Sequence, residues 1–333
     1  MIMMEIWLTD VERIDTVCLP DSGTVDMELG TDTDNDFEMV IPYKDYDPEK
    51  YMTEGYLYVP GTEYGGKIIR VQEDTSEKSL IFNGITFRSM LSRKIVQPPS
   101  GSDYLILSGD LQECLSDLIG SRFGDLVVVP ESITGITVSN YQVDRYINLK
   151  TAIDKLLNPY GYRLDIKSDG SAEKMHLIIS AKPVTDYSEE IEISQDGNLN
   201  FRIGKAVPAF TYMICAGSGD LKDREIVFLD WNNGNPKEIT SIPSGETVRE
   251  FFYDYPNAED RSSLINGGID KFFEINKTDT QEVTYSASDD VYEIGDIVGG
   301  RSYVTGFTVS EPISQKIVKI NHNRIDITYK VGK

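Results

Sequence analysis

Two short stretches and two histidines carry residue types that could bind a nucleotide, hold a metal ion or do catalysis. The first stretch, Gly61–Ile68, matches the G-x-x-x-x-G-K pattern of a phosphate-binding loop. Such a loop needs Ser or Thr after its lysine to hold Mg²⁺, and it leads into a helix whose N-terminus faces the phosphate. Here Ile68 follows Lys67 and the stretch continues into a predicted strand, so we expect no nucleotide site.

The second stretch, Asp32–Asp36, starts like a calcium-binding loop. An EF-hand loop has Gly at its sixth position and Glu at its twelfth, whereas those positions here hold Phe37 and Tyr43. We therefore predict an exposed acidic turn. Weak Ca²⁺ binding stays an open alternative, because several carboxylates lie close together in the sequence.

The histidines, His176 and His322, are far apart in the sequence, and neither has a neighbouring Cys or His. The sequence contains no H-E-x-x-H, G-x-S-x-G or C-x-x-C motif. With 55 Asp and Glu residues, a glycosidase pair is not excluded by pattern, but no carboxylate stands out from the rest. We expect no catalytic, cofactor-binding or metal-binding residue, no cofactor and no enzymatic activity.

The chain is strongly acidic, with a formal net charge of −23 over 333 residues. A surface of this sign repels nucleic-acid phosphates, so we expect no sequence-specific nucleic-acid binding. The length allows two or three domains. An apolar share of 40% is ordinary for a globular protein and too high for disorder.

The three cysteines, Cys18, Cys114 and Cys215, are odd in number and widely spaced. This spacing fits neither a disulfide framework nor a zinc site, so we predict three buried or half-buried thiols in a protein made in a reducing cytoplasm. No apolar run approaches the roughly 18 residues of a membrane-spanning helix. The N-terminus has no basic region or cleavage site typical of a signal peptide.

Most of the chain shows the pattern of β-strands. From Ile2 to Phe87, short apolar runs are separated by turn signals such as Pro60-Gly61 and Gly65-Gly66. Short strands at this spacing predict a barrel or sandwich. The consecutive prolines of Gln97–Ser102 mark a boundary, because proline cannot continue a hydrogen-bonded ladder.

Helical spacing appears after that boundary. Asp110 is a candidate cap for a helix that buries Leu111, Leu115, Leu118 and Ile119 and ends before Gly124. Asn148 is a candidate cap for a second helix, with Leu149, Ile153, Leu156 and Leu157 on one face. Together with predicted strands at Leu126–Val129, Tyr162–Ile166 and Met175–Ala181, these helices indicate an α+β domain.

Strands return from Ser188 onward, at Glu190–Ile193, Leu199–Ile203 and Phe210–Ala216. A weaker helical pattern covers Glu246–Ile275, where Gly267-Gly268 disfavours one straight helix. From Val283 to the C-terminus the pattern is β again. It ends in a hairpin with Val318 and Ile320 on one arm and Ile325, Ile327, Tyr329 and Val331 on the other.

Aromatic residues are densest in Phe251–Pro256. Three interpretations stay open for this segment: core and rim of a β-domain, a subunit interface, where tyrosine is enriched, or a platform for sugars. An internal similarity is also present, since Lys67–Val71 resembles Lys316–Ile320 and each is followed by a polar turn and a second strand.

The most informative stretch is Gly65–Glu73 followed by Lys78–Lys94. It predicts two extended, half-buried strands, then a loop and a basic segment that leaves the sheet. It resembles the tail-hub, or baseplate-hub, proteins of long-tailed bacteriophages and prophages with non-contractile tails. In that family a strand feeds a G-x-T/S-F/L-x-x-L-L-x-R-x-I run, here Gly84–Ile95. A second segment, Tyr292–Val298, is similar to the G-D-x-V step that enters the family's last barrel strands.

The resemblance implies a mainly β fold with α+β insertions: two similar β-barrel domains, an α+β domain and a smaller helix-containing segment. The expected ranges are 1–97 for the first barrel, 98–187 for the α+β domain, 188–235 with 283–333 for the second barrel, and 236–282 for the inserted segment. No catalytic residue is carried over from the family, because its motifs are patterns of strands and turns.

The resemblance also implies a structural function. We expect a homotrimeric ring at the tail tip of a virion, made in the host bacterial cytoplasm, through which DNA passes. Its expected partners are the distal tail protein, the tail tube, the tape-measure protein and tip or fibre proteins. A carbohydrate-binding or polysaccharide-degrading β-protein of a phage or cell surface is the alternative. An enzyme of another type would need a deep pocket holding His176 or His322 beside a carboxylate.

Overall fold

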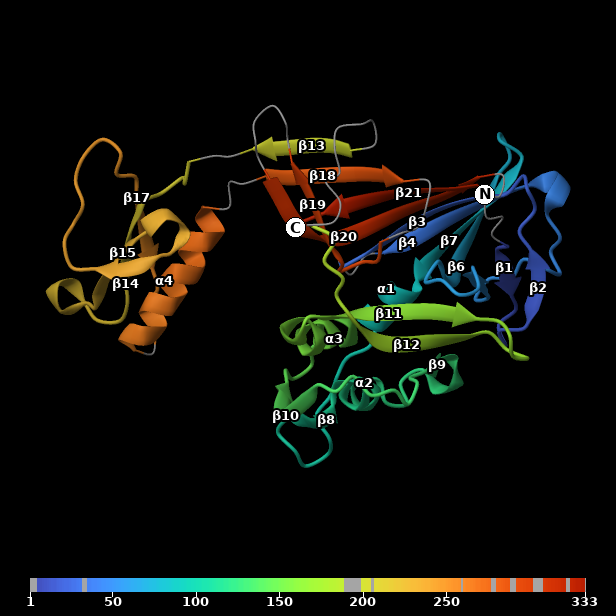
Figure 1. The fold of residues 1–333 in the computed structure, drawn as a ribbon, viewed down its shortest axis with the longest axis horizontal. Helices are drawn as coiled ribbons and strands as arrows, with labels where there is room; N and C mark the ends of the chain where they lie inside the picture. Colours follow the sequence, from blue (N-terminus) through green and yellow to red (C-terminus); the bar gives the residue numbers. More distant parts are fainter. Residues whose placement is uncertain are drawn as a thin grey trace. The chain divides into compact units, whose positions relative to one another are not determined.

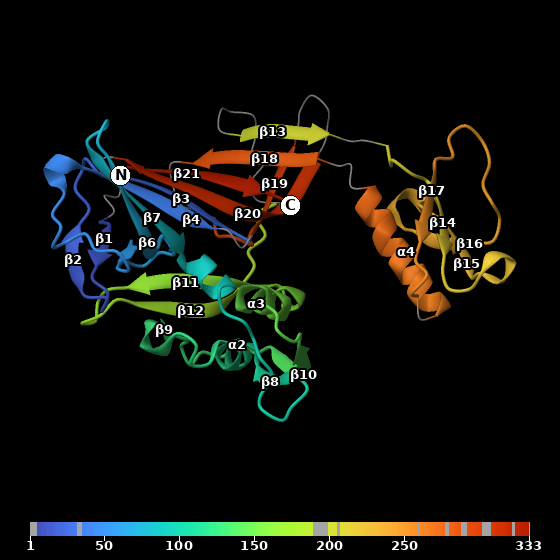
Figure 2. The same ribbon diagram turned by 180° about the vertical axis from the view of Figure 1, so that it is seen from behind.

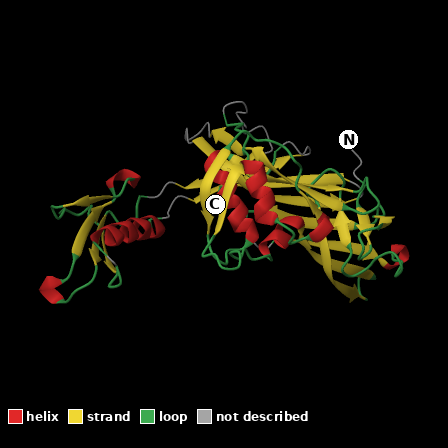
Figure 3. Ribbon diagram, turned by 90° about the horizontal axis from the view of Figure 1, so that it is seen from below, coloured by secondary structure: helices red, strands yellow, loops and turns green. Residues whose placement is uncertain are grey.

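The chain forms two compact units, Met1–Phe201 with Val283–Lys333 (unit 1) and Arg202–Glu282 (unit 2). In the computed structural model, the described residues are 5–31, 35–188, 199–204, 207–258, 260–276, 280–287, 292–301, 308–321 and 324–332. The fold is mainly β (Figure 3).

The largest sheet lies mainly in unit 1 and contains twelve of the described strands. Its order is β13-β18-β21-β20-β3-β4-β7-β6-β5-β1-β2, with β19 paired to β20 (Figure 1). Every described register in this sheet is antiparallel. The strands are β1 (Trp7–Thr9), β2 (Asp15–Cys18), β3 (Thr24–Gly30), β4 (Asp36–Pro42), β5 (Tyr56–Tyr58), β6 (Gly65–Asp74), β7 (Ser79–Thr86), β13 (Leu199–Gly204), β18 (Thr280–Ala287), β19 (Ile297–Arg301), β20 (Thr308–Asn321) and β21 (Arg324–Val331).

The prediction of two separate barrels is not confirmed by this sheet. Among the described strands no sheet closes into a barrel, and strands from the two predicted barrels share one sheet. The joint is the antiparallel pairing of β20 with β3, in which Val318 lies opposite Met27 and Ile320 opposite Val25. Alternation along a strand fixes which side chains share a face, but it does not fix which strand becomes the neighbour.

A mixed segment of unit 1 follows β7. The pairs β8–β10 and β11–β12 are antiparallel, and β9 is parallel to β12. Helices α2 and α3 bury their leucines in one core with β11 and β12. The elements are α1 (Phe87–Ser92), β8 (Leu105–Asp110), α2 (Leu111–Ile119), β9 (Val127–Val128), β10 (Thr137–Val143), α3 (Leu149–Leu157), β11 (Tyr162–Asp169) and β12 (His176–Pro183).

Both predicted helix caps are confirmed. The Asp110 carboxylate accepts from the Gln112 backbone N–H at 2.9 Å, and the Asn148 amide oxygen accepts from the Thr151 N–H at 2.9 Å. Helix α2 ends at Ile119, and its C-cap Gly120, four residues before the predicted stop, has a φ of +53°. A residue without Cβ adopts a positive φ at low cost, which favours glycine at this helix end.

Removing the Asp110 carboxylate will destabilise unit 1. Asp110 also accepts from the backbone N–H groups of Thr134 (3.1 Å) and Gly135 (2.9 Å), so it ties a loop to the helix start. We expect Asp110→Ala to lower the free energy of unfolding by about 1–2 kcal/mol, as for other N-cap losses. Chemical denaturation of both proteins measures the difference. Ser116→Ala, on the exposed side of α2, is the control.

The same carboxylate gives the effect a pH dependence. Partial burial alone would raise the pKa of Asp110, but the hydrogen bonds from Gln112, Thr134 and Gly135 outweigh it and lower the pKa. A carboxyl whose folded pKa is depressed stabilises the fold above its unfolded pKa and loses that contribution as the pH falls through the folded pKa. The difference in the free energy of unfolding between wild type and Asp110→Ala should therefore become smaller below about pH 4.

Unit 2 is a four-stranded sheet with one helix (Figure 2). The strand order is β16-β15-β14-β17, with β17 parallel to β14 and the other pairs antiparallel. The elements are β14 (Tyr212–Ala216), β15 (Ile226–Asp230), β16 (Lys237–Ile239), β17 (Glu250–Asp254) and α4 (Arg261–Ile275).

The helical pattern predicted from Glu246 is wrong over its first part, which forms β17. From Arg261 it is confirmed as α4, which keeps both Gly267 and Gly268. A Cβ on Gly268 would lie 2.6 Å from Cys215 Sγ, so glycine lets the helix approach the sheet closely. Burial raises the pKa of the Cys215 thiol to about 12.

Candidate functional site: a buried ionic junction

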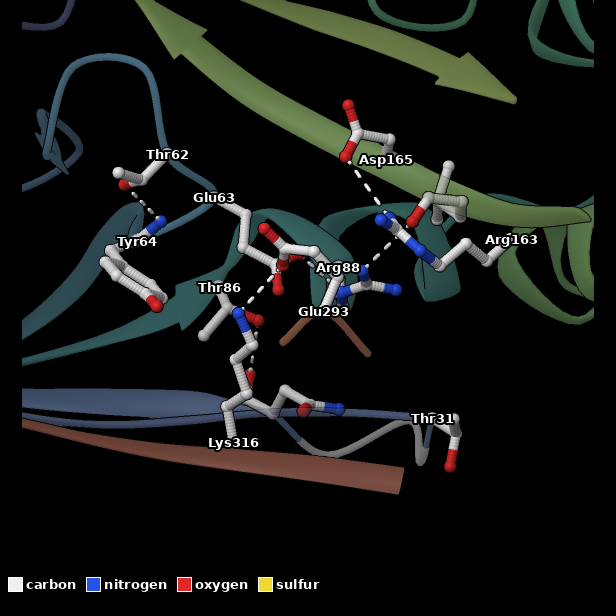
Figure 4. Close-up of polar contacts among 12 residues, drawn as sticks. Thr31, Thr62, Glu63, Tyr64, Thr86, Arg88, Arg163, Asp165, Glu293 and Lys316 are labelled. Carbon is white, nitrogen blue, oxygen red and sulfur yellow. Dashed lines mark hydrogen bonds and ion pairs between the residues drawn. The ribbon is translucent and has the colours of Figure 1, made fainter. Parts of the chain in front are cut away.

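The two segments that carry the family resemblance meet at one cluster of charged side chains in unit 1, most of them buried (Figure 4). We call this cluster the ionic junction. It consists of Glu63, Arg88, Arg163, Asp165, Glu293, Asp296 and Lys316.

Helix α1 brings the first motif into the junction. The two strands predicted within Gly65–Glu73 and Lys78–Lys94 are confirmed as β6 and β7, but the helix follows β7 directly, in place of the predicted loop. Thr86 caps α1 by accepting from the Ser89 N–H at 3.3 Å. Phe87 and Leu91 are buried, which orients the helix and turns Arg88 inward.

Arg88 forms a fully buried ion pair with Glu63, which lies in the loop before β6. Its Nε donates to Glu63 Oε2 at 2.7 Å, and both side chains are only 5% exposed. Its Nη2 donates to the Leu164 carbonyl of β11 at 3.2 Å. Glu63 Oε1 accepts no hydrogen bond from the described residues. Glu63 and Arg88 line a cavity of about 70 Å³, which has room for a few water molecules.

The second motif forms a tight turn whose aspartate enters the junction. Gly295 has a φ of +97°, and Asp296 is 1% exposed. The Asp296 carboxylate accepts from Arg163 Nε at 2.9 Å, the Thr185 N–H at 3.0 Å and the Glu293 N–H at 3.1 Å. Burial disfavours the charge on Arg163, but Asp296, Glu293 and Asp165 raise its pKa.

Lys316 of β20 completes the junction. Its side chain is 1% exposed, and Nζ donates to Glu293 Oε2 at 2.8 Å. Nζ also lies 5.6 Å from the ring centroid of Tyr64 and 5.7 Å from that of Tyr329. Contacts of a cation with two ring faces and a carboxylate offset the loss of hydration. The charged groups thus connect the β6–α1 region, β11 and the C-terminal strands.

Gly295→Ala will weaken the turn that presents Asp296. Alanine at a φ of +97° is strained, and its Cβ would lie 3.1 Å from Arg163 Cβ. Strain of this kind costs about 1–3 kcal/mol. We therefore expect chemical denaturation to show a free energy of unfolding that is lower by that amount. Gly135→Ala is the control for backbone strain alone, since it has a φ of +79° and open space around the new Cβ. If the two variants lose the same free energy of unfolding, the contact of the new Cβ with Arg163 adds nothing to the backbone strain.

The phosphate-loop candidate, Gly61–Ile68, is a structural loop. The Gly61 N–H donates to the Ser168 carbonyl and the Ser168 N–H donates to the Thr62 carbonyl, both at 2.8 Å. As predicted, a strand follows it, because β6 begins at Gly65.

The candidate residue His176 is not among the ion pairs of the junction. Residues 32–34 of the acidic stretch and His322 lie outside the described part of the chain. His176 Nε2 lies 3.8 Å from Asp169 Oδ2. In the described ranges, no group of three or more His, Cys, Asp or Glu side chains could hold a metal ion. The described helices include none long and apolar enough to cross a membrane.

The predicted burial of the cysteines is confirmed, with Cys18 half-buried, Cys114 and Cys215 buried, and all three thiols free. The aromatic segment Phe251–Pro256 lies in and just after β17. The ionic junction was not predicted. One signal was available, because the period of two that places Val318 and Ile320 in the core also places Lys316 on that face.

The fold is that of a phage tail protein. No family model matches the sequence, and the search of curated proteins finds no match. Among solved structures, the 43 kDa tail protein of prophage MuSo2 from Shewanella oneidensis is 12% identical with a TM-score of 0.57, covering 99% of this chain and 98% of that one. The tail protein from Neisseria meningitidis MC58 is 9% identical with a TM-score of 0.51, and the match covers 99% of this chain and 96% of that one. The predicted resemblance to phage tail proteins is thereby confirmed at the level of fold.

Proposed function

We propose that the chain is a structural tail-hub protein of a bacteriophage or prophage. The observation that carries the proposal is the whole-chain likeness to the MuSo2 tail protein, which extends over 99% of this chain. This likeness supports a structural role in a virion tail, and with it a location in the virion.

The large sheet offers a physical route to a ring. In the described chain it is open, with β13 at one end and β2 at the other. Open edges present unpaired backbone groups that favour pairing with another chain. In the proposed ring, three copies assemble around a channel for DNA, and closure into barrel-like walls comes from neighbouring copies. The four domain ranges expected from the sequence remain predictions.

The proposed partners are the distal tail protein, the tail tube and the tape-measure protein on one side, and tip or fibre proteins on the other. The net charge of −23 is consistent with a channel wall to which DNA does not adsorb. The ionic junction pairs its charges with one another and includes no histidine or cysteine, which is consistent with a structural, non-enzymatic role.

Oligomer mass tests the proposal. We expect native mass spectrometry of the purified chain to give a trimer, and negative-stain images to show a ring with a central channel. A chain that stays monomeric alone and also when mixed with its distal tail protein would overturn the proposal.

Saccharide binding is a second candidate function, favoured by one groove in unit 1. Tyr43, Tyr46, Val71, Gln72, Glu73 and Leu80 line an open hollow of about 460 Å³. The Tyr43 hydroxyl donates to Glu73 Oε1 at 2.6 Å, and this hydrogen bond raises the pKa of Tyr43 to about 12. Aromatic faces beside amide and carboxylate oxygens suit a sugar ring, which has apolar C–H faces and hydroxyl groups.

Calorimetry with wall polysaccharide of the host bacterium tests this candidate. If the groove binds saccharide, we expect a measurable Kd for wild type and a Kd at least tenfold higher for Tyr43→Ala. The matched control is Tyr104→Ala, which removes a tyrosine of similar exposure (39% against 38%) outside the groove. Binding that both variants retain, or no binding by wild type, would eliminate the groove as a saccharide site.

A further inference from the structure

The sheet of unit 2 carries apolar side chains on both of its faces, and α4 covers one of them (Figure 2). Met213, Cys215, Val227 and Leu229 are fully buried on the covered face. The packing is close, because a Cβ on Gly268 of α4 would lie 2.7 Å from Leu229 Cδ1. A sheet face that stays in water normally carries polar side chains.

The opposite face carries an apolar row instead. Phe228 lies directly opposite Ile239 on one side and Ile214 on the other, and Ile214 lies opposite Phe252. These four side chains therefore form one continuous row across all four strands, which we call the open row. Phe252 is 57% exposed, and the other three are half-buried. A contiguous apolar row that keeps part of its surface in water is typical of an interaction site.

The side chains that flank the open row are mixed, with three carboxylates and two cations among them. Two residues along each strand, the next row on the same face consists of Lys237, Asp230, Tyr212 and Glu250. On the other flank, Asp254 pairs with Arg224, and Ile226 is 36% exposed. The flanks therefore carry more carboxylates than cations, on a chain of net charge −23. A partner with basic residues beside its apolar surface complements this pattern.

The spacing of the open row fits an α-helix. Neighbouring strands lie about 4.8 Å apart, so four side chains span roughly 14 Å. A helix rises about 5.4 Å per turn and repeats an apolar side chain every three or four residues. About three turns would therefore place one apolar side chain against each member of the row.

From the exposure, the flanking charge and the spacing, we propose that the open row docks a basic amphipathic helix of a partner protein. The helix buries its apolar stripe on Ile214, Phe228, Ile239 and Phe252, and its lysines or arginines face Asp230 and Glu250. This is the groove-docking mode of helix recognition applied to an open sheet face. The inference does not depend on the proposed ring.

The test uses the full chain and a defined probe. The probe is a fluorescein-labelled 18-residue helical peptide with leucines at i, i+3, i+4 and i+7 spacing and lysines elsewhere. A second peptide keeps the lysines and replaces every leucine by serine. We expect fluorescence anisotropy to show saturable one-to-one binding of the first peptide, and binding at least tenfold weaker for the second.

Two variants locate the binding site. Phe252→Ser should weaken binding of the leucine–lysine peptide at least tenfold. Phe273→Ser, which removes a 46% exposed phenylalanine from α4, should leave the Kd within twofold of wild type. Circular dichroism confirms that both variants are folded. Lys237→Glu adds a carboxylate to the flank and should tighten binding, which a merely structural role of the row would not produce.

Three outcomes would overturn the proposal. The serine–lysine peptide could bind as tightly as the leucine–lysine peptide, which would reduce the interaction to charge. Phe252→Ser could bind like wild type, which would locate the peptide elsewhere. Sedimentation could show wild-type self-association that Phe252→Ser abolishes, which would make a second copy of this chain the occupant.

Discussion

Gly66→Ala will prevent unit 1 from folding normally, because the new methyl group has no space. Gly66 lies in β6 between Leu57 of β5 and Thr86 of β7. A Cβ at this position would lie 2.0 Å from the Ile85 carbonyl oxygen and 2.8 Å from Thr86 Cα. Both are backbone atoms in the β6–β7 ladder, so they move only if the ladder breaks. We therefore expect the free energy of unfolding to fall by more than the ~1–3 kcal/mol that ordinary overpacking costs.

Denaturant unfolding followed by tryptophan fluorescence measures this loss. Trp7 lies in unit 1 and Trp231 in unit 2, so a Trp231→Phe background makes the signal report unit 1 alone. The control is Gly61→Ala, where the new Cβ has open space and only the φ of +78° is unfavourable. That strain costs about 1–2 kcal/mol. A Gly66→Ala protein as soluble and stable as Gly61→Ala would show that β6 and β7 can separate without loss.

Elements specified by local sequence were predictable. Asp110 and Asn148 begin helices because their side chains bond backbone N–H groups two or three residues ahead, a contact that the sequence contains entirely. The final hairpin was predictable for the same reason, since alternation and turn position place Val318 opposite Ile327 and Ile320 opposite Ile325.

Elements specified by distant partners were not predictable. Phe251–Tyr253 fall in the segment for which a weak helical pattern was predicted, but they form a strand because β14, about forty residues earlier, supplies a parallel edge. The two predicted barrels were not confirmed, and the pairing of β20 with β3 was not predictable, because no residue near β20 in the sequence identifies β3 as its neighbour. Tertiary pairing decides such segments, and a single sequence does not record the pairing.

The ionic junction combines both situations. Its turns were visible as motifs, since Gly295-Asp296 and Gly84–Ile95 carried the family resemblance. The ion pairs were not visible, because Arg163 and Asp296 are 133 positions apart in the sequence. In this chain the two motifs thus mark turns beside a buried charge, and the partner of each charge comes from an element elsewhere in unit 1.

Arg88→Met will destabilise unit 1 strongly, whereas the double variant Arg88→Met with Glu63→Leu will recover most of the loss. The single variant leaves the Glu63 carboxylate 95% buried with neither oxygen paired to a cation, since Oε1 has no hydrogen-bond partner among the described residues. Breaking a buried ion pair on one side costs about 3–5 kcal/mol. Replacing both partners by apolar side chains of similar volume is often neutral, so we expect the double variant within about 1 kcal/mol of wild type.

A double-mutant cycle in the Trp231→Phe background separates this ion pair from its surroundings. Arg88→Met, Glu63→Leu and the double variant are each unfolded in urea, and the coupling energy is the departure from additivity. The Lys155–Asp144 pair, whose side chains are 55% and 59% exposed, provides a matched surface cycle. Exposed pairs couple by about 0–1 kcal/mol. If the Glu63–Arg88 pair couples no more strongly than this surface pair, the junction contributes little to joining β6, α1 and β11, and the apolar core alone holds these elements together.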